Sequence, residues 1–258
     1  MNKIVVITGA TSGIGEELKR LYNLNGDTVI NLSYDVKEED LLNFRLDVSK
    51  REDVFDVFEK IHSHYNRIDV LVNCAGYGVF GATEVLSKAE CEKIIDVNFF
   101  GVLWCSQACI KYMQKGSRII NISSACALFE LPYRTMYCAS KSAVNSLTFG
   151  MRMELRQFGI DVVSICPGDI KTNFSKNRVI EINENDKYAK ALNESIGVIG
   201  KKESARMDRA KAVKKIYKIC NKRKSKPMYI IGRKYKFLNF LKKIFGLKVW
   251  LHFTYKMF

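Results

Sequence analysis

Proline, histidine and tryptophan are scarce in this chain of 258 residues, which contains 3, 3 and 2 copies of them. Because proline interrupts helices, so few prolines allow long helices to run unbroken. The histidines lie at positions 62, 64 and 252, and none accompanies the strand–turn–helix serine that a Ser-His-Asp hydrolase requires. No cysteine and histidine spacing fits a metal site, so we expect no metal.

Long apolar runs are also missing. No stretch of about 18 apolar residues occurs, so a membrane-spanning helix is not expected. The N-terminus, MNKIVVITGA, leads directly into a strand-like segment and lacks the features of a signal peptide. The eight cysteines form no C-x-x-C pair and mostly fall in apolar stretches. These features favour buried core cysteines in a reducing, cytoplasmic compartment over a disulfide framework.

Acidic residues are almost absent from the C-terminal part. Residues 201–258 contain 19 Lys or Arg and 2 Asp or Glu, whereas residues 1–200 contain 23 basic and 25 acidic residues. The net charge of +15 therefore belongs to the tail, which argues against a nucleic-acid-binding function for the whole chain.

Apolar runs alternate with segments of helical period along most of the chain. The expected strands are Ile4–Ile7, Thr28–Leu32, Asn43–Leu46, Val70–Val72, Arg118–Ile122, Asp161–Ile165 and Met228–Ile231. The expected helices cover about 13–25, 50–65, 85–114, 137–158 and 207–222. Strands that alternate with helices form βαβ units, so we predict an α/β fold: a Rossmann-like, doubly wound parallel sheet of about seven strands with helices on both faces.

No internal repeat or linker is visible, so we expect a single domain over residues 1–258. The segment 173–200 is polar and poorly patterned, and it follows the sixth strand on the side of the sheet where ligands bind. A long connection there is more often a functional lid than a packing element, and both alternatives stay open.

Glycines follow the first strand, in TGATSGIG. Gly9, Gly13 and Gly15 would let backbone N–H groups approach phosphates at a helix N-terminus, where the helix dipole favours negative charge. The spacing differs from the G-x-G-x-x-G dinucleotide fingerprint. Its place in a βαβ unit still predicts a nucleotide-binding turn rather than a plain tight turn.

The motif YCASK places Tyr137 and Lys141 on one face of a helix. An adjacent ammonium would favour the phenolate and lower the tyrosine pKa, as general acid–base catalysis requires. A Y-x-x-x-K pair alone is most often an exposed helix pair. Ser124, which directly follows the strand Arg118–Ile122, favours a catalytic group instead.

In these motifs the chain resembles the short-chain dehydrogenase/reductase superfamily. The motifs run in order through the Gly-rich turn, Asp47-Val48, NCAG at 73–76, Asn98, ISS at 122–124, YCASK at 137–141 and PGDIKT at 167–172. The resemblance implies a hydride transfer between a nicotinamide cofactor and a carbonyl or secondary alcohol. It assigns proton transfer to Tyr137 and Lys141, stabilisation of the substrate oxygen to Ser124, and a bound water to Asn98. The positive charge of the oxidised nicotinamide would act with the Lys141 ammonium to lower the pKa of Tyr137. A buried asparagine at a helix kink is the alternative for Asn98.

The resemblance also implies the cofactor contacts. They are Gly9, Thr11, Ser12, Gly13, Ile14, Gly15, Ser33, Tyr34, Asp47, Val48, Asn73, Ala75, Gly76, Tyr137, Lys141, Pro167, Gly168, Ile170 and Thr172. Ser33 stands where NAD enzymes place a carboxylate, which favours NADP(H) over NAD(H). Lys37 could supply the positive charge for NADP, but Asp35 could also serve as the ribose acid of an NAD enzyme.

The segment 127–136 between Ser124 and Tyr137 is expected to line the substrate cavity. Its apolar residues Leu128, Phe129, Leu131 and Pro132 predict a hydrophobic substrate. Many relatives of this kind are homodimers or homotetramers. A catalytically idle, dinucleotide-sensing or membrane-associated regulator is the alternative to an enzyme.

Residues 235–258 contain eight aromatic residues, five lysines and no acidic residue. Phe237, Leu238, Leu241, Ile244 and Phe245 share one helical face, so the whole segment 233–258 reads as a basic amphipathic element. It is expected to pack on the core or on a second subunit. The alternatives are peripheral contact with an anionic membrane and, less favoured, nucleic acid.

Overall fold

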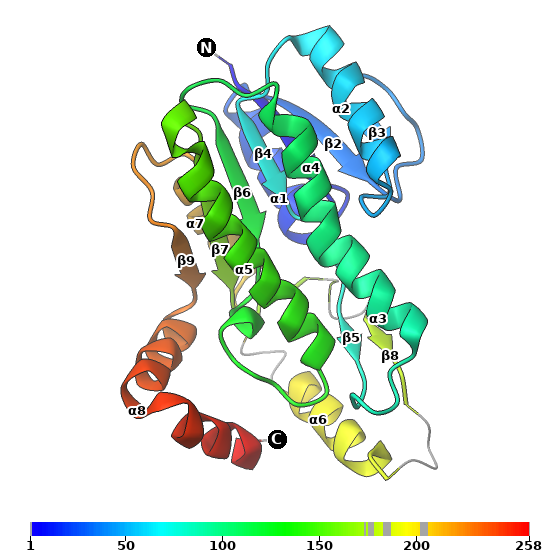
Figure 1. Ribbon diagram of the computed structural model, residues 1–258, viewed down its shortest axis with the longest axis vertical. Coiled ribbons are helices and arrows are strands. Elements are labelled where there is room, and N and C mark those ends of the chain that lie inside the picture. The colour runs from blue at the N-terminus through cyan, green and yellow to red at the C-terminus, as the bar shows by residue number, and fades with distance from the viewer. Residues whose placement is uncertain (1, 173, 175–177, 183–186, 202–205, 258) are drawn as a thin grey trace.

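The computed structural model describes residues 2–172, 174, 178–182, 187–201 and 206–257 (Figure 1). The strands are β1 (Ile4–Thr8), β2 (Thr28–Ser33), β3 (Asn43–Arg45), β4 (Val70–Asn73), β5 (Val79–Phe80), β6 (Arg118–Ile122), β7 (Asp161–Pro167), β8 (Val179–Ile180) and β9 (Met228–Ile231). The helices are α1 (Gly13–Leu24), α2 (Arg51–Tyr65), α3 (Lys88–Ile95), α4 (Gly101–Ile110), α5 (Thr135–Leu155), α6 (Ala189–Lys201), α7 (Arg209–Cys220) and α8 (Arg233–Met257).

Seven parallel strands form the central sheet in the order β3-β2-β1-β4-β6-β7-β9. The chain builds outward from β1 to β3 and then crosses to β4 and builds in the opposite direction. This arrangement confirms the predicted doubly wound sheet. The reversal lies between β1 and β4, and ligands of such sheets bind outside the carboxyl ends of the strands at this point.

Two apolar cores cover the two faces of the sheet. Helices α2, α4 and α5 pack on one face, through residues such as Phe58, Cys105 and Met151. Helices α1 and α7 pack on the other, through residues such as Leu18 and Val213. Figure 1 shows these two helical layers on opposite sides of the strands. Successive side chains of the strands point to alternate faces, so both cores draw on the same apolar runs.

The predicted helix over 85–114 is interrupted. A π-helical turn, η1 (Asp96–Phe100), separates α3 from α4 and turns the buried side chain of Asn98 inward. The span Lys88–Ile110 is the one helix of the described residues with the length and composition to cross a membrane. It packs in this fold against the sheet, where Cys105 and Ala108 are fully buried.

The region 173–200 contains more structure than its polar sequence suggested. β8 pairs with β5 in a separate two-stranded sheet, and α6 follows. Tyr188 donates a hydrogen bond to Glu84 at 2.8 Å, which holds the start of α6 to the segment after β5. Residues 173, 175–177 and 183–186 of this predicted lid lie outside the described residues.

Helix α8 differs from the continuous amphipathic helix that the sequence predicted. Gly246 has φ 72° and ψ 174°, so the helix breaks there into two pieces (Figure 1). Among the five residues of the predicted apolar face, Leu238 packs on the core, whereas Phe237, Ile244 and Phe245 are exposed. The break instead brings Trp250 into the core beside Phe129, with ring centroids 5.2 Å apart.

Asp161 at the start of β7 joins β6, α5 and the loop before β9. It pairs with Arg118 at 3.0 Å and with Arg152, and it accepts a hydrogen bond from Ser225 at 2.5 Å. Its side chain is 23% exposed, so these interactions are only partly screened by water.

We predict that Asp161→Ala lowers the free energy of unfolding by about 2–3 kcal/mol, because two half-buried arginines lose their shared partner. Glu52→Ala is the control, since the Arg51–Glu52 pair is exposed and 3.9 Å long, and it should cost less than about 0.5 kcal/mol. Urea denaturation measures both. Equal effects of the two substitutions would contradict the prediction.

Candidate active site

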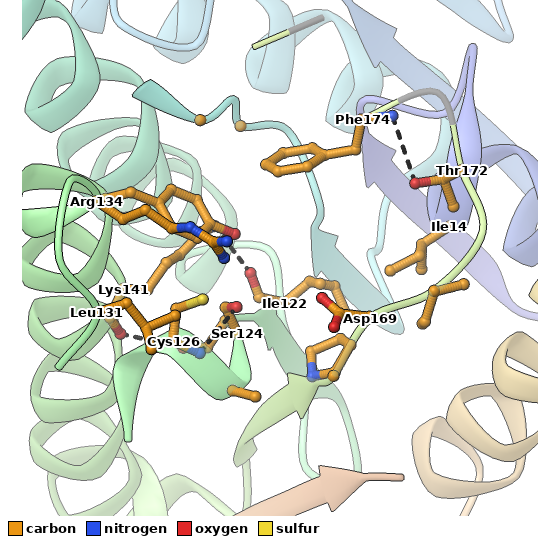
Figure 2. A pocket seen from close by; sticks show the side chains of 18 of the residues that line it. Ile14, Ile122, Ser124, Cys126, Leu131, Arg134, Lys141, Asp169, Thr172 and Phe174 are labelled. Carbon is orange, nitrogen blue, oxygen red and sulfur yellow. Dashed lines mark hydrogen bonds between the residues drawn. The ribbon is translucent and has the colours of Figure 1, made fainter. Parts of the chain in front are cut away.

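One cavity opens at the carboxyl ends of β1, β4, β6 and β7 (Figure 2). Most of the predicted site residues line it: Gly9, Ser12, Gly13, Ile14, Ala75, Gly76, Ser124, Phe129, Leu131, Tyr137, Lys141, Pro167, Gly168, Ile170 and Thr172. They come from segments up to 160 residues apart, and the parallel sheet brings them to one edge because all its strands end on the same side.

The glycine turn has the geometry of a phosphate cradle. Gly9 and Gly13 have φ values of 69° and 58°, a conformation that residues with a Cβ rarely adopt. A Cβ added at Gly15 would lie 2.3 Å from the carbonyl oxygen of Gly9, so only glycine lets α1 approach the turn so closely. Ser12 makes no side-chain cap, which leaves the first N–H groups of α1 available to a ligand. The turn therefore fits the pyrophosphate of a dinucleotide.

Tyr137 and Lys141 lie on α5. Ser124 comes after the end of β6, with Ser123 between them. Lys141 is 4% exposed, and its ammonium donates a hydrogen bond to the carbonyl oxygen of Ile122 at 3.1 Å (Figure 2). Burial lowers the pKa of this amine to about 8. The Oγ of Ser124 accepts a hydrogen bond from the backbone of Cys126 at 3.1 Å.

The protein's own groups do not by themselves make Tyr137 acidic. Burial raises the pKa of Tyr137, as does the neighbouring Cys126, while a hydrogen bond with Ser124 lowers it. The amine of Lys141 points to Ile122 and makes no direct hydrogen bond with the phenol. The predicted acidic phenol also requires the positive charge of an oxidised nicotinamide, so it stays a prediction, while burial among the protein's own groups raises this pKa.

Asn98 lies fully buried in η1, and its side chain bridges two segments. Its Oδ1 accepts a hydrogen bond from the backbone N–H of Tyr77 at 3.0 Å, and its Nδ2 donates to the Tyr77 carbonyl at 3.0 Å and to Ser140 at 3.2 Å. A Cβ on Gly76 would lie 2.8 Å from Asn98 Oδ1 and 3.4 Å from the Lys141 amine. Asn98 thus fixes the backbone next to the lysine.

Several predicted cofactor residues lie beside the cavity rather than on its wall. Asn73 is buried and donates hydrogen bonds to Ser106 and Asn121, which ties β4 to its neighbours. Val48 is in the core against Gly101, and Asp47 accepts hydrogen bonds from the backbone and hydroxyl of Ser49.

The end of β2 carries the groups that bear on cofactor choice. Ser33 is buried and donates to Asn31 at 2.6 Å, whereas Tyr34 is 68% exposed. Thr11 donates a hydrogen bond to Oδ1 of Asp35 at 2.6 Å. Sequence reasoning missed Arg45 at the end of β3, whose guanidinium carbon lies 6.0 Å from the centroid of the Tyr34 ring.

The substrate side of the cavity is more varied than predicted. Phe129 and Leu131 line it, but Leu128 and Pro132 do not, because Leu128 packs against the cluster of Ala125, Phe129 and Trp250 instead. The residues that sequence reasoning missed come from the segment before α5, the segments between β7 and α7, and α8. They are Arg134, Phe174, Arg178, Arg206, Lys234, Tyr235, Leu238, Trp250 and Thr254. No local signal marks them, since only the fold brings them to the cavity.

A family model described as "short chain dehydrogenase" matches residues 3–183. The chain belongs to the short-chain dehydrogenase family. This confirms the resemblance found in the sequence and makes the protein an NAD(P)-dependent oxidoreductase that acts on small molecules.

Individual relatives agree with this assignment. A 3-ketodihydrosphingosine reductase of Bacteroides thetaiotaomicron is 35% identical over 207 residues, which cover 78% of this chain and 77% of that protein. A short-chain dehydrogenase of Streptomyces avermitilis has a similar structure, with a TM-score of 0.82, 26% identity and coverage of 95% and 94%. The structure titled ElxO with NADP bound has a TM-score of 0.76, 26% identity and coverage of 92% and 99%.

We expect the buried Lys141 to lower the free energy of unfolding of this dehydrogenase at neutral pH. The amine has a pKa of about 8 when folded and 10.5 otherwise, so the unfolded chain binds more protons between these values and stability rises with pH there. We predict that Lys141→Met raises the free energy of unfolding at pH 7 by about 1–3 kcal/mol. The gain should shrink towards pH 10.

Urea denaturation at both pH values tests this, with the exposed Lys60 substituted to Met as the control. Two results would contradict the destabilising effect of burying Lys141. One is a Lys141→Met protein that is less stable than wild type at pH 7. The other is a difference in stability between the two proteins that does not change with pH.

Proposed function

We propose that this dehydrogenase interconverts a carbonyl and a secondary alcohol on a hydrophobic substrate, with NADP(H) as the preferred cofactor. The observation that carries the proposal is the convergence of Ser124, Tyr137 and Lys141 on the cavity that also contains the glycine turn. Residues 1–258 would act as one unit, with 173–200 as a lid over the substrate.

The chain's own residues would handle the proton. A nicotinamide cofactor supplies the hydride to the carbonyl carbon when bound, or accepts it in oxidation. Tyr137 would donate its phenolic proton to the carbonyl oxygen, and Ser124 would donate a hydrogen bond to that same oxygen as charge develops. Lys141 would then return a proton towards Tyr137, which its pKa of about 8 allows near neutrality.

The glycine turn and α1 would hold the pyrophosphate, while Pro167, Gly168, Ile170 and Thr172 would shape the nicotinamide side. Since burial raises the pKa of Tyr137, the phenol would become acidic only beside the positive charge of an oxidised nicotinamide. This dependence would keep proton transfer coupled to cofactor binding.

Tyr137→Phe tests the proposal directly, because it removes the acidic hydroxyl and leaves the ring in place. We predict that turnover falls by about 1,000-fold or more, with dinucleotide affinity changed less than about threefold. Carbonyl and alcohol panels with both cofactors, followed by absorbance of the reduced form, measure turnover.

Tyr65→Phe is the control, since Tyr65 lies at the end of α2 outside the cavity. Full retention of activity in Tyr137→Phe would refute the mechanism. Dinucleotide binding without turnover of any carbonyl in the wild type would instead favour the dinucleotide-sensing regulator.

The preference for NADP(H) rests on charge at the end of β2. Ser33 brings no negative charge, Asp35 is engaged by Thr11, and Arg45 lies beside Tyr34. A guanidinium here can pair with a 2′-phosphate, which favours NADP(H).

We predict that Arg45→Ala raises the KM for NADPH about tenfold and leaves the KM for NADH unchanged, because only NADPH has the phosphate that Arg45 would pair with. Arg51→Ala is the control, since Arg51 stacks on Phe55 of α2 instead. Steady-state kinetics with each cofactor provide the measurement. Equal effects on the two cofactors, or a wild-type preference for NADH, would overturn this choice.

The surface of α8 supports a peripheral membrane contact. Phe237, Phe240, Ile244, Phe245, Leu247, Val249, Leu251, Phe253 and Tyr255 are all more than 40% exposed. Basic residues of α8 lie among them, and its other side lines the cavity. Aromatic and cationic side chains together favour an anionic lipid surface, so we propose a cytoplasmic enzyme with peripheral membrane contact and no nucleic-acid partner.

Sedimentation with anionic and neutral liposomes tests this contact. Phe240→Glu combined with Phe245→Glu should reduce binding to anionic liposomes at least tenfold, because it places charge where apolar area would be buried. Met153→Glu is the control on α5, where Met153 is 74% exposed.

Absence of lipid binding in the wild type would refute the membrane contact. The apolar surface would then be assigned to a second copy of the chain, in the homodimer or homotetramer that we propose for this protein. Sedimentation velocity measures that assembly.

A further inference from the structure

The substrate side of the cavity carries an unexpected excess of positive charge. Among the described residues that line it, the cationic side chains are Arg134, Lys141, Arg178, Arg206 and Lys234. Asp169 is the carboxylate among them, and it accepts a hydrogen bond from Tyr235 at 2.5 Å. Apart from the catalytic Lys141, Arg134 is the buried cation of this set, and burying a cation is costly unless an anion compensates it.

Two of the arginines share one aromatic ring. The guanidinium carbon of Arg134 lies 4.6 Å from the centroid of the Phe80 ring, and that of Arg178 lies 4.9 Å from it. Stacking on an aromatic face orients the plane of a guanidinium group. Phe80 therefore fixes both groups beside each other at the cavity wall.

Arg134 is buried, and one of its hydrogen-bond donors lacks a partner. The residue is 9% exposed, and its Nε has no hydrogen-bond partner within the described part of the chain. Figure 2 shows its side chain directed into the cavity from the segment that precedes Tyr137. Buried polar groups without a partner are rare in proteins and point to a ligand or an ordered water.

The charges in the cavity already influence one another. Burial, followed by the nearby Arg134 and Arg206, lowers the pKa of Arg178 to about 10. On the other side, a hydrogen bond from Cys138 and the charge of Arg134 lower the pKa of the Cys126 thiol to about 6. The cavity wall thus disfavours further positive charge and stabilises negative charge close to Tyr137.

We propose that Arg134 and Arg178, held on Phe80, bind an acidic group of the substrate. This deepens and rests on the proposed function. The substrate is then an anionic amphiphile, with a carboxylate, phosphate or sulfate at the arginines, its carbonyl or alcohol at Tyr137, and its apolar chain along Phe129, Leu131 and Trp250. The phosphates of the dinucleotide belong at the glycine turn, on another segment of the wall.

Pairs of matched ketones test the proposal. A set of long-chain keto acids that differ in the spacing between ketone and carboxylate is compared with the methyl esters of the same acids. For the best spacing we expect kcat/KM of the acid to exceed that of the ester about 10- to 100-fold, the range of a charge-assisted hydrogen bond.

Substitution of the arginines should remove this preference. Arg134→Met and, independently, Arg178→Met should lower the acid-to-ester ratio at least tenfold, and Arg134→Lys should restore part of it because the charge returns. Arg156→Met is the matched control, since Arg156 is exposed beyond the opposite end of α5, and its ratio should equal that of the wild type. Thermal unfolding shows which variants are folded. If Arg134→Met is unfolded, Arg178→Met provides the test.

A binding measurement separates this proposal from the proposed function. Trp104→Phe leaves Trp250 at the cavity wall as the single tryptophan, so its fluorescence reports binding of acid and ester without turnover. Tighter binding of the acid that depends on Arg134 or Arg178 supports the arginine site even if no ketone is reduced.

Two results would overturn the arginine site while leaving the oxidoreductase intact. One is equal turnover and binding of acids and esters by the wild type. The other is a higher KM for the dinucleotide in the arginine variants at an unchanged acid-to-ester ratio, which would assign these arginines to the cofactor.

Discussion

Burial of one ammonium group governs the chemistry of this site. Lys141 projects from α5 to the end of β6, where it is almost fully enclosed and donates its hydrogen bond to the carbonyl oxygen of Ile122. The enclosure lowers its pKa to about 8 and, in the same cavity, raises the pKa of Tyr137. Both pKa shifts favour the neutral form of the group, and a bound cofactor would change this balance.

The surroundings of this pair divide into two sides with opposite chemistry. On one side, the glycines of the turn after β1 place backbone N–H groups at the cavity, where they can bind a pyrophosphate. On the other, α8 and the segment before α5 combine aromatic rings with Arg134. Because α8 has one side on the cavity and an exposed apolar surface on the other, substrate choice and membrane contact would depend on the same helix.

The regular part of the fold could be predicted from sequence, because each buried strand is a short apolar run and each helix has an apolar period. All seven strands of the central sheet were predicted, as were the glycine turn and the Tyr137–Lys141 pair, whose motifs are local. The break at Gly246 and the contact of Arg134 with Phe80 could not be, since they depend on how distant segments meet. The burial that raises the pKa of Tyr137 could not be predicted either, because a motif gives spacing but not burial.

The central claim is that burial makes Tyr137 a weak acid, which becomes acidic only with the oxidised cofactor bound. Tyrosinate absorbance, taken as the difference between wild type and Tyr137→Phe over a pH titration, measures this directly. We predict no tyrosinate from Tyr137 below about pH 10 in the free protein, and its appearance at least two pH units lower with the oxidised dinucleotide bound. Tyrosinate near neutral pH in the free protein, or no shift on binding, would contradict the account.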